Sequence, residues 1–336
     1  MAKFNINENH SDHELISDIF EACQAWIDVG GGFGATSSIT GDGAVEAAEK
    51  RFSALHSNRP ALLVPSATYG LYSALKAVSV RAGSLVCCPD YDWPSSLGAI
   101  RALGATPLLI PVFDQTLTID PAALRKLDLS NISAIIATHI HGIPADIPAI
   151  REAIGQDIPI IEDCSQAFGS ELDGQPVGAL GDIAVFSFGP GKALYAGEGG
   201  MIVTRDWALY EKVIRETAHP IRQLIGGVGN DVKFTNFSIR PHPITAIMLL
   251  HALDAFERSN SNENFTRMSD KLSKIEGITL IGMDDRRLNS SNRIPVYYMG
   301  GLNTLPEWCI LTPSGALNLW KLKSSDKPVY LAELDV

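Results

Sequence analysis

Between residues 61 and 204 the chain alternates short apolar runs with stretches of helical periodicity. Buried strands separated by helices are typical of a largely parallel sheet that is covered on both faces. The active groups of such a sheet gather in the loops at the C-terminal ends of its strands. The runs expected to form strands are 61–64, 85–88, 106–112, 134–138, 159–162, 183–188 and 201–204, and helices are expected over 95–103, 147–154 and 244–258.

Composition excludes several classes of protein. The 336 residues carry a net charge of -11, which argues against a nucleic-acid partner because such proteins present a basic face. No window approaches 18 consecutive apolar residues, and the polar, acidic residues 1–14 do not resemble a secretory signal. The 5 cysteines lack Cys-x-x-Cys spacing and fit the reduced thiols of a cytoplasmic protein better than disulfides or a metal site.

The glycine-rich segment that contains Lys192 is not a nucleotide P-loop. That motif needs glycine where this chain has Phe186, and a hydroxyl where it has Ala193. The glycines near residue 30 do not follow a strand, so they do not form a dinucleotide-binding fingerprint.

Asp163 and Lys192 instead match the needs of a pyridoxal 5′-phosphate (PLP) enzyme. Asp163 directly follows an expected strand, and Lys192 lies in a loop after another. A lysine amine forms a Schiff base with the cofactor's aldehyde, while a carboxylate pairs with its pyridinium nitrogen. Either residue alone would be interpreted as a turn residue or a solvated charge, so the prediction depends on their occurring together.

The surrounding sequence resembles the DegT/DnrJ/EryC1/StrS family of sugar aminotransferases over residues 40 to 250. The resemblance implies an α/β protein of fold type I. Its large PLP-binding domain would span 1–245, with an N-terminal entry segment and a mostly parallel sheet, and a shortened α/β domain would span 246–336. The matching segments are Thr40–Phe52, Ser66-Ala67-Thr68, Pro89–Ser96, His139–Asp146 and Ile160–Thr204.

The resemblance also implies roles around the cofactor. Ala67 and Thr68 would bind its phosphate at a helix N-terminus, and Ser187 would add a hydroxyl. Gln166 would donate a hydrogen bond to the cofactor's phenolic oxygen. Trp93 would stack on the pyridine ring, with Tyr91 as a neighbouring alternative. Structural roles are expected for three other polar residues of these segments, His139, His141 and the loop residue Glu198.

Members of this family form homodimers in which a segment of one subunit reaches the partner's phosphate. The corresponding segment here contains Asn236, Ser238 and Arg240. Arg240 aligns with the family's arginine, whereas Ser238 stands where the family has asparagine or lysine. The sequence leaves open which of the three side chains crosses the interface, and Arg240 could equally form a salt bridge near a helix start.

The resemblance implies a PLP-dependent aminotransferase that moves an amino group from an amino acid, glutamate in the first instance, to a keto-sugar, a cyclitol or a related keto substrate in a biosynthetic pathway. Beyond residue 260 the pattern weakens, and we expect a helix near 264–275 and strands near 278–281 and 294–299. Residues 303–336 match nothing in the family, so inference about the substrate ends there. Two alternatives stay open: the same cofactor used for racemisation, elimination or bond formation, and a non-catalytic PLP-binding protein.

Overall fold

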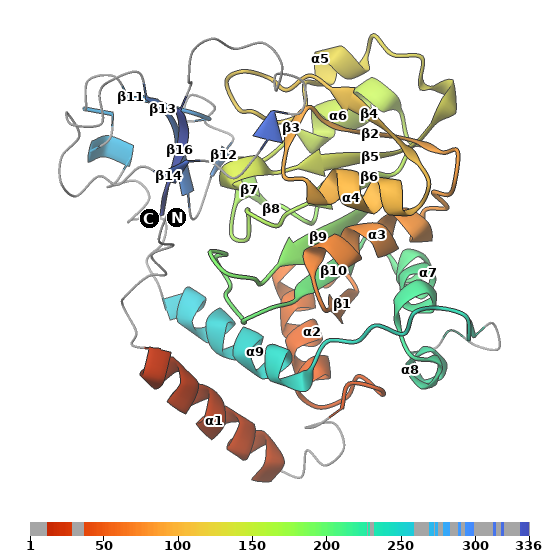
Figure 1. Cartoon of the computed structure of the whole chain (residues 1–336), viewed down its shortest axis with the longest axis vertical. Helices are drawn as coiled ribbons and strands as arrows, with labels where there is room; N and C mark the ends of the chain where they lie inside the picture. The colour runs from red at the N-terminus through yellow and green to blue at the C-terminus, as the bar shows by residue number, and fades with distance from the viewer. Residues whose placement is uncertain are drawn as a thin grey trace.

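A seven-stranded sheet forms the centre of the computed structural model (Figure 1). The structure describes residues 12–28, 37–226, 228, 232–258, 269–271, 273–274, 278–282, 288–289, 293–298, 312–313, 317–318 and 330–335. In spatial order the strands are β1 (Ala61–Val64), β10 (Gly200–Thr204), β9 (Ile183–Ser187), β6 (Ile160–Asp163), β5 (Ile132–Thr138), β2 (Leu85–Pro89) and β4 (Thr106–Ile110).

The sheet is mostly parallel, which confirms the fold class predicted from the apolar runs. β9, β6, β5, β2 and β4 run in one direction, and β10 alone lies antiparallel to its neighbours β1 and β9. All seven predicted strands are present. The strand predicted over 106–112 ends earlier, at Ile110, because Pro111 follows and has no N–H to continue the ladder.

Helices cover both faces of the sheet (Figure 1). Alternate residues of β1 show the two layers: Leu62 and Val64 pack into one apolar cluster, and Ala61 and Leu63 into another. The first cluster includes residues of α3 (Ala67–Ala77), α4 (Ser95–Ala102) and α7 (Trp207–Thr217); the second includes residues of α2 (Ala44–Leu55) and α9 (Pro243–Arg258). A third, isoleucine-rich cluster lies under α5 (Pro121–Leu124) and α6 (Ile147–Ile154).

A buried ion pair fixes the entry segment. Both carboxylate oxygens of Glu49 accept hydrogen bonds from Arg222 at 2.6 Å, and one also accepts the Leu63 N–H at 2.8 Å. The pair therefore joins α2, β1 and α8 (Pro220–Ile225). Gly41 has φ +76, and a Cβ there would lie 2.5 Å from the Arg222 guanidinium carbon, so this position needs glycine.

Four of the described strands after residue 277 form a second, antiparallel sheet beside β3 (Tyr91–Asp92) and β7 (Glu171–Leu172) (Figure 1). Its order is β11 (Ile278–Leu280), β13 (Arg293–Tyr298), β16 (Tyr330–Asp335) and β14 (Thr312–Pro313), which confirms strands near 278–281 and 294–299. Two short strands attach to the first half of the chain: β12 (Leu288–Asn289) pairs with β7, and β15 (Leu317–Asn318) pairs with β3.

The predicted domain boundary after residue 245 stays a prediction. α9 begins at Pro243 and buries Ala246, Ile247, Leu249 and Leu253 in the cluster it shares with α2. α1 (Asp12–Asp28) packs Cys23 and Trp26 against the same cluster. Much of the helix predicted near 264–275 lies outside the described residues.

Within the part of the chain that the structure describes, the helices are too short or too polar to cross a bilayer.

Candidate active site

Asp163 is the last residue of β6 and is only 3% exposed. It stands between Thr138 of β5 and Val185 of β9 in the register of the parallel strands. One of its carboxylate oxygens accepts the Ser165 N–H at 3.0 Å, which fixes the orientation of the side chain. A buried carboxylate is thus presented at the C-terminal edge of the sheet, where the sequence places it.

Lys192 lies in the loop that follows β9, the strand next to β6. Backbone hydrogen bonds close the base of this loop, from Phe188 N–H to Gly199 at 3.0 Å and from Ala196 N–H to Phe188 at 2.9 Å. The Lys192 N–H donates to Gly189 at 3.3 Å inside the loop. Asp163 ends β6 and Lys192 follows the adjacent parallel strand β9, so both residues lie at the same edge of the sheet.

The N-terminus of α3 adjoins this edge. Ser66 caps the helix by accepting the Tyr69 N–H at 3.2 Å, and it forms an isolated bridge with Gly199 at the end of the lysine loop. The exposed Thr68 donates its hydroxyl hydrogen to Ser95 at 3.0 Å. The N–H groups of Ala67 and Thr68 belong to the first turn, where a helix has no backbone acceptors of its own. This end of α3 can receive an anion.

Two aromatic residues predicted as alternatives differ in their surroundings. The Tyr91 ring is only 7% exposed, packs in a cluster with Ile140 and Ile143, and forms a hydrogen bond of 3.0 Å with His141 Nε2. Trp93 is 48% exposed. Tyr91 is therefore a packing residue, whereas Trp93 presents a ring face on which a planar ligand can stack.

Gln166 is held with a defined amide orientation. Its Oε1 accepts the His141 N–H at 2.7 Å, and because a backbone N–H requires an acceptor, the Nε2 group is the side that faces away. Gln166 can thus donate a hydrogen bond, which is the role the sequence predicts.

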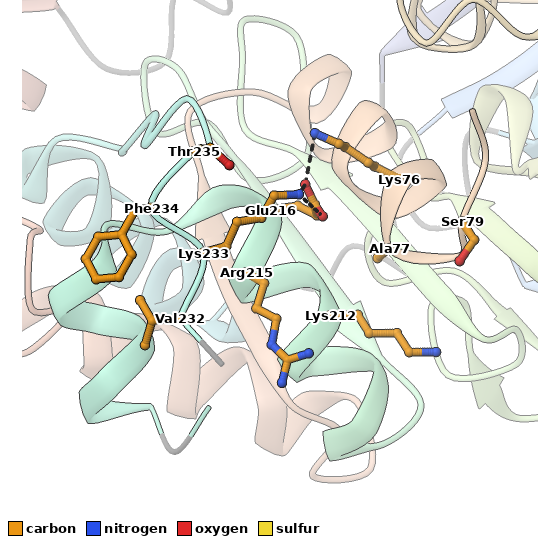
Figure 2. Close-up of a pocket in the computed structure, with 10 residues that line it drawn as sticks. All are labelled: Lys76, Ala77, Ser79, Lys212, Arg215, Glu216, Val232, Lys233, Phe234 and Thr235. Carbon is orange, nitrogen blue, oxygen red and sulfur yellow. Dashed lines mark hydrogen bonds and ion pairs between the residues drawn. The ribbon is translucent and has the colours of Figure 1, made fainter. Parts of the chain in front are cut away.

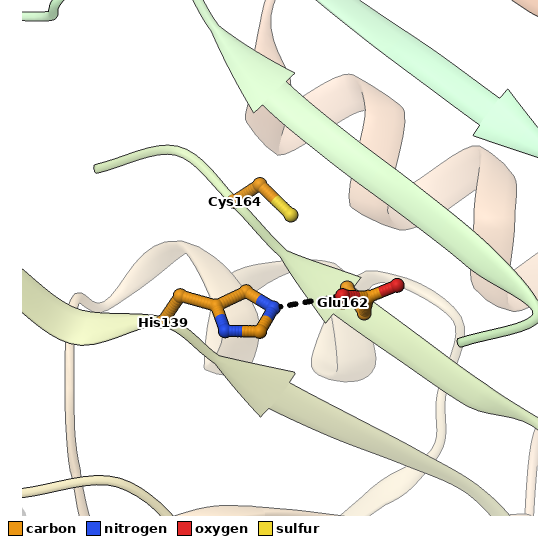
Figure 3. A group of neighbouring side chains, drawn as sticks. All are labelled: His139, Glu162 and Cys164. Atoms are coloured by element: carbon orange, nitrogen blue, oxygen red, sulfur yellow. Dashed lines mark hydrogen bonds and ion pairs between the residues drawn. The ribbon is translucent and has the colours of Figure 1, made fainter. Parts of the chain in front are cut away.

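A buried cluster behind these residues contains His139, Glu162 and Cys164 (Figure 3). His139 Nδ1 accepts the Ala145 N–H at 2.9 Å, so the proton is on Nε2, which donates to Glu162 at 3.0 Å. Both imidazole nitrogens are used, leaving none to bind a metal. The cluster is a structural link between β5 and β6, as expected for His139.

Glu162 binds the loop that precedes β9. Its carboxylate accepts N–H groups of Gly178 at 2.9 Å, Leu180 at 3.0 Å and Gly181 at 2.5 Å. Burial alone would raise the pKa of Glu162, but the hydrogen bond from His139 and those from the backbone hold it below its usual value. Glu162 is not predictable as a functional residue from the sequence, where its one signal is a glutamate inside an apolar strand.

The segment expected to reach a partner subunit divides into two parts. Asn236 donates to the backbone oxygens of Arg215 and Ala218, both at 2.8 Å, and its Oδ1 accepts the Ser238 N–H at 2.9 Å. Arg240 is exposed and donates to Ser238, to its Oγ at 2.9 Å and to its carbonyl at 3.2 Å. Asn236 therefore anchors its own chain, while Arg240 and Ser238 lie at the surface.

A cavity of about 580 Å³ lies at the other end of α3 (Figure 2). Glu216 forms ion pairs there with Lys76 at 2.9 Å and with Lys233 at 2.7 Å. Lys76 and Ala77, in the last turn of the 11-residue helix α3, line this cavity, so it lies at the opposite end of the helix from the capped N-terminus and is separate from the candidate active site.

Comparison with known proteins agrees with this geometry. GDP-perosamine synthase of Escherichia coli O157:H7 is 34% identical over 167 residues, which cover 49% of this chain and 46% of that protein. The chain thus spans about half the length of this curated relative. Two solved structures share the fold. DesV of S. venezuelae is 26% identical with a TM-score of 0.70, and the match covers 85% of this chain and 75% of that one. 3-Amino-5-hydroxybenzoic acid synthase is 25% identical with a TM-score of 0.72, and the match covers 88% of this chain and 76% of that one.

The family match spans residues 35–301 and includes every proposed site residue. It ends just before residues 303–336, the segment for which the sequence showed no counterpart. The chain belongs to the DegT/DnrJ/EryC1/StrS aminotransferase family, whose cofactor is pyridoxal 5′-phosphate.

Proposed function

We propose that the protein is an aminotransferase that takes an amino group from an amino acid, glutamate in the first instance, and gives it to a keto-sugar or cyclitol. The observation that carries the proposal is the placement of Asp163 at the C-terminal end of β6 and of Lys192 in the loop after the adjacent parallel strand β9. The names of the relatives, GDP-perosamine synthase and 3-amino-5-hydroxybenzoic acid synthase, support a sugar or a cyclic product.

The residues present fit PLP. A buried carboxylate at Asp163 suits a cationic ring nitrogen, and the N-terminus of α3 with Thr68 and Ser187 suits a phosphate. Gln166 offers an N–H donor for the phenolic oxygen, and Trp93 an exposed ring for stacking. When bound, the cofactor supplies an aldehyde that accepts amino groups and a ring that accepts the electrons of a broken Cα–H bond.

Each protein group then has a defined task. Asp163 keeps a proton at the ring nitrogen through its negative charge. Lys192 holds the cofactor through its amine and, when released, moves the proton at the substrate's α carbon.

Glutamate should convert the purified holoenzyme in a single turnover. With no keto substrate present, we expect one equivalent of 2-oxoglutarate per subunit and a loss of the visible absorbance of the bound cofactor, because the amino group stays on the enzyme. Stopped-flow absorbance and quantification of the oxo acid measure both. Formation of D-glutamate without any oxo acid would favour the alternative of racemisation. No change with any amino acid in a panel would contradict the proposal.

We also propose that the protein is a homodimer in which Arg240 or Ser238 contributes to the partner's phosphate site. Exposed apolar side chains gather around this segment and on α8. Exposed apolar side chains that gather in one region are typical of a protein–protein contact. Their exposed fractions are 74% for Phe234, 71% for Phe237, 42% for Ile239, 57% for Leu224 and 65% for Ile225.

Replacing Phe237 by glutamate should shift the protein toward the monomer and weaken PLP binding, because a charge would be buried in the interface. Sedimentation velocity at several protein concentrations measures the shift. Phe113→Glu is the matched control, since Phe113 is 45% exposed but lies after β4, away from this segment. A wild-type protein that stays monomeric at micromolar concentration would refute the proposed dimer.

A cytoplasmic location is likewise proposed. It is supported by the four described cysteines, Cys23, Cys87, Cys88 and Cys164, all of which are free thiols.

A further inference from the structure

A second buried carboxyl group lies beside Asp163. Asp92, the last residue of β3, is only 1% exposed. Its Oδ1 accepts the Trp93 N–H at 2.8 Å, and its Oδ2 bonds the Thr138 hydroxyl at 3.0 Å. Thr138 is the register partner of Asp163 on the neighbouring strand. Asp92 thus links the backbone of the exposed tryptophan to the strand end next to the catalytic carboxylate.

Two carboxyl groups in this buried setting will not both ionise readily. Burial, and next the negative charge of Asp163, raise the pKa of Asp92 to about 7. A further titratable neighbour is Cys88 of β2. Burial and next the negative charge of Asp92 raise the pKa of its thiol, and the positive charge of Arg101 opposes them. Below neutral pH, Asp92 therefore keeps a proton in this buried setting.

The hydrogen bond to Thr138 suits either state of Asp92. The hydroxyl donates to Asp92 when the latter is a carboxylate, and it can accept from Asp92 when the latter is a carboxylic acid. The Trp93 N–H has an acceptor oxygen in both cases. Asp92 can consequently gain or lose its proton while its surroundings keep their arrangement.

We propose that Asp92 is a positioning residue that sets the charge beside the ring nitrogen of the cofactor. Asp92 holds a proton while Asp163 has no cationic partner. It releases that proton to solvent when a cationic ring nitrogen neutralises Asp163. This inference rests on the proposed pairing of Asp163 with the cofactor's ring nitrogen. One O–H bond of Asp92 breaks, and the proton passes to water or buffer. The summed charge of Asp92, Asp163 and the cofactor's ring nitrogen after binding is then close to the summed charge of the two aspartates before binding.

Proton counting during PLP binding tests this inference. Calorimetric titration of the cofactor-free full-length chain at pH 6, in two buffers with different ionisation enthalpies, gives the number of protons exchanged. Because the pKa of Asp92 is about 7, nearly all of it is protonated at pH 6. For each PLP molecule bound, we expect the wild type to release over half a proton more than the Asp92→Asn variant releases. Asp90→Asn, which changes another buried aspartate of the same segment, should match the wild type.

Equal proton numbers for the wild type and Asp92→Asn, with PLP bound by both, would overturn the role of Asp92 and leave the proposed function intact. Failure of the wild type to bind PLP would overturn both. Asp92→Thr offers a second uncharged side chain if the asparagine variant does not fold.

The stability of the cofactor-free chain gives an independent measurement. The pKa of Asp92 is raised from 3.8 to about 7, so its contribution to folding is complete below pH 3.8 and is lost as the pH rises through 7. Urea unfolding between pH 4 and 8 should show this loss in the wild type and not in the uncharged variant. An identical pH dependence in both would overturn the inference.

Discussion

Replacement of Lys192 by alanine should reduce transamination by on the order of 10⁴-fold or more, because one residue supplies both the covalent attachment and the proton transfer. Lys192→Arg should be nearly as inactive. A guanidinium group keeps the positive charge but does not give up its proton near neutral pH. Coupled measurement of oxo acid formation with glutamate gives the rates.

A second readout identifies the attachment itself. Borohydride reduction of the wild-type holoenzyme should fix the cofactor to the peptide that contains Lys192, as detected by mass spectrometry. Lys212→Ala is the matched control, because Lys212 lines the separate cavity at the far end of α3, and its activity should stay within twofold of the wild type. Labelling of another lysine, or an active alanine variant, would assign the chemistry to a different group.

The sequence predicted the parallel sheet and its principal polar residues for a physical reason. Buried parallel strands are continuous apolar runs, and the polar residue that ends such a run lies at the functional edge. Asp163 is recognisable by this rule, and Lys192 lies in the loop that follows the next strand of the sheet, β9. Their roles toward the cofactor stay predictions, but the structure brings their strands together as neighbours.

Residues whose partners lie far away in the chain were not predictable in this way. In the sequence, Glu162 is a charged residue inside an apolar strand with no evident partner. Its role becomes visible only in the fold, where the N–H groups of Gly178 and Gly181 donate hydrogen bonds to its carboxylate. Asp92 becomes a neighbour of Asp163 only through the hydroxyl of Thr138, a residue 46 positions away in sequence from Asp92. Periodicity records which face of an element is apolar, and it contains no information about such cross-chain hydrogen bonds.

The C-terminal segment shows the same limit. Residues 303–336 gave no recognisable pattern, yet Leu317 and Asn318 pair antiparallel with Asp92 and Tyr91 of β3. A two-residue strand has no periodicity of its own, so only the partner strand defines it. This pairing places β15 beside the strand that leads to Trp93.

Removal of the Glu162 side chain should have the largest effect on folding. Its carboxylate is fully buried and accepts hydrogen bonds from four donors: His139 and the N–H groups of Gly178, Leu180 and Gly181. Glu162→Ala leaves these donors without an acceptor, and we expect a loss of about 3–5 kcal/mol in the free energy of unfolding. Glu162→Gln should also destabilise the protein, since its amide NH₂ would meet backbone donors.

Urea unfolding of the full chain measures this loss, with Glu152→Ala as the control. Glu152 has a side chain that is 76% exposed and pairs with Arg125 at the surface, so its removal should change stability by at most about 0.5 kcal/mol. Because the pKa of Glu162 is held below its usual value, its contribution is present above the unfolded-state pKa and is lost as the pH falls through the folded value. The difference between the wild type and Glu162→Ala should therefore shrink in acid. A difference that is small at pH 7, or that grows in acid, would mean that the carboxylate does not hold the loop before β9 against the end of β6.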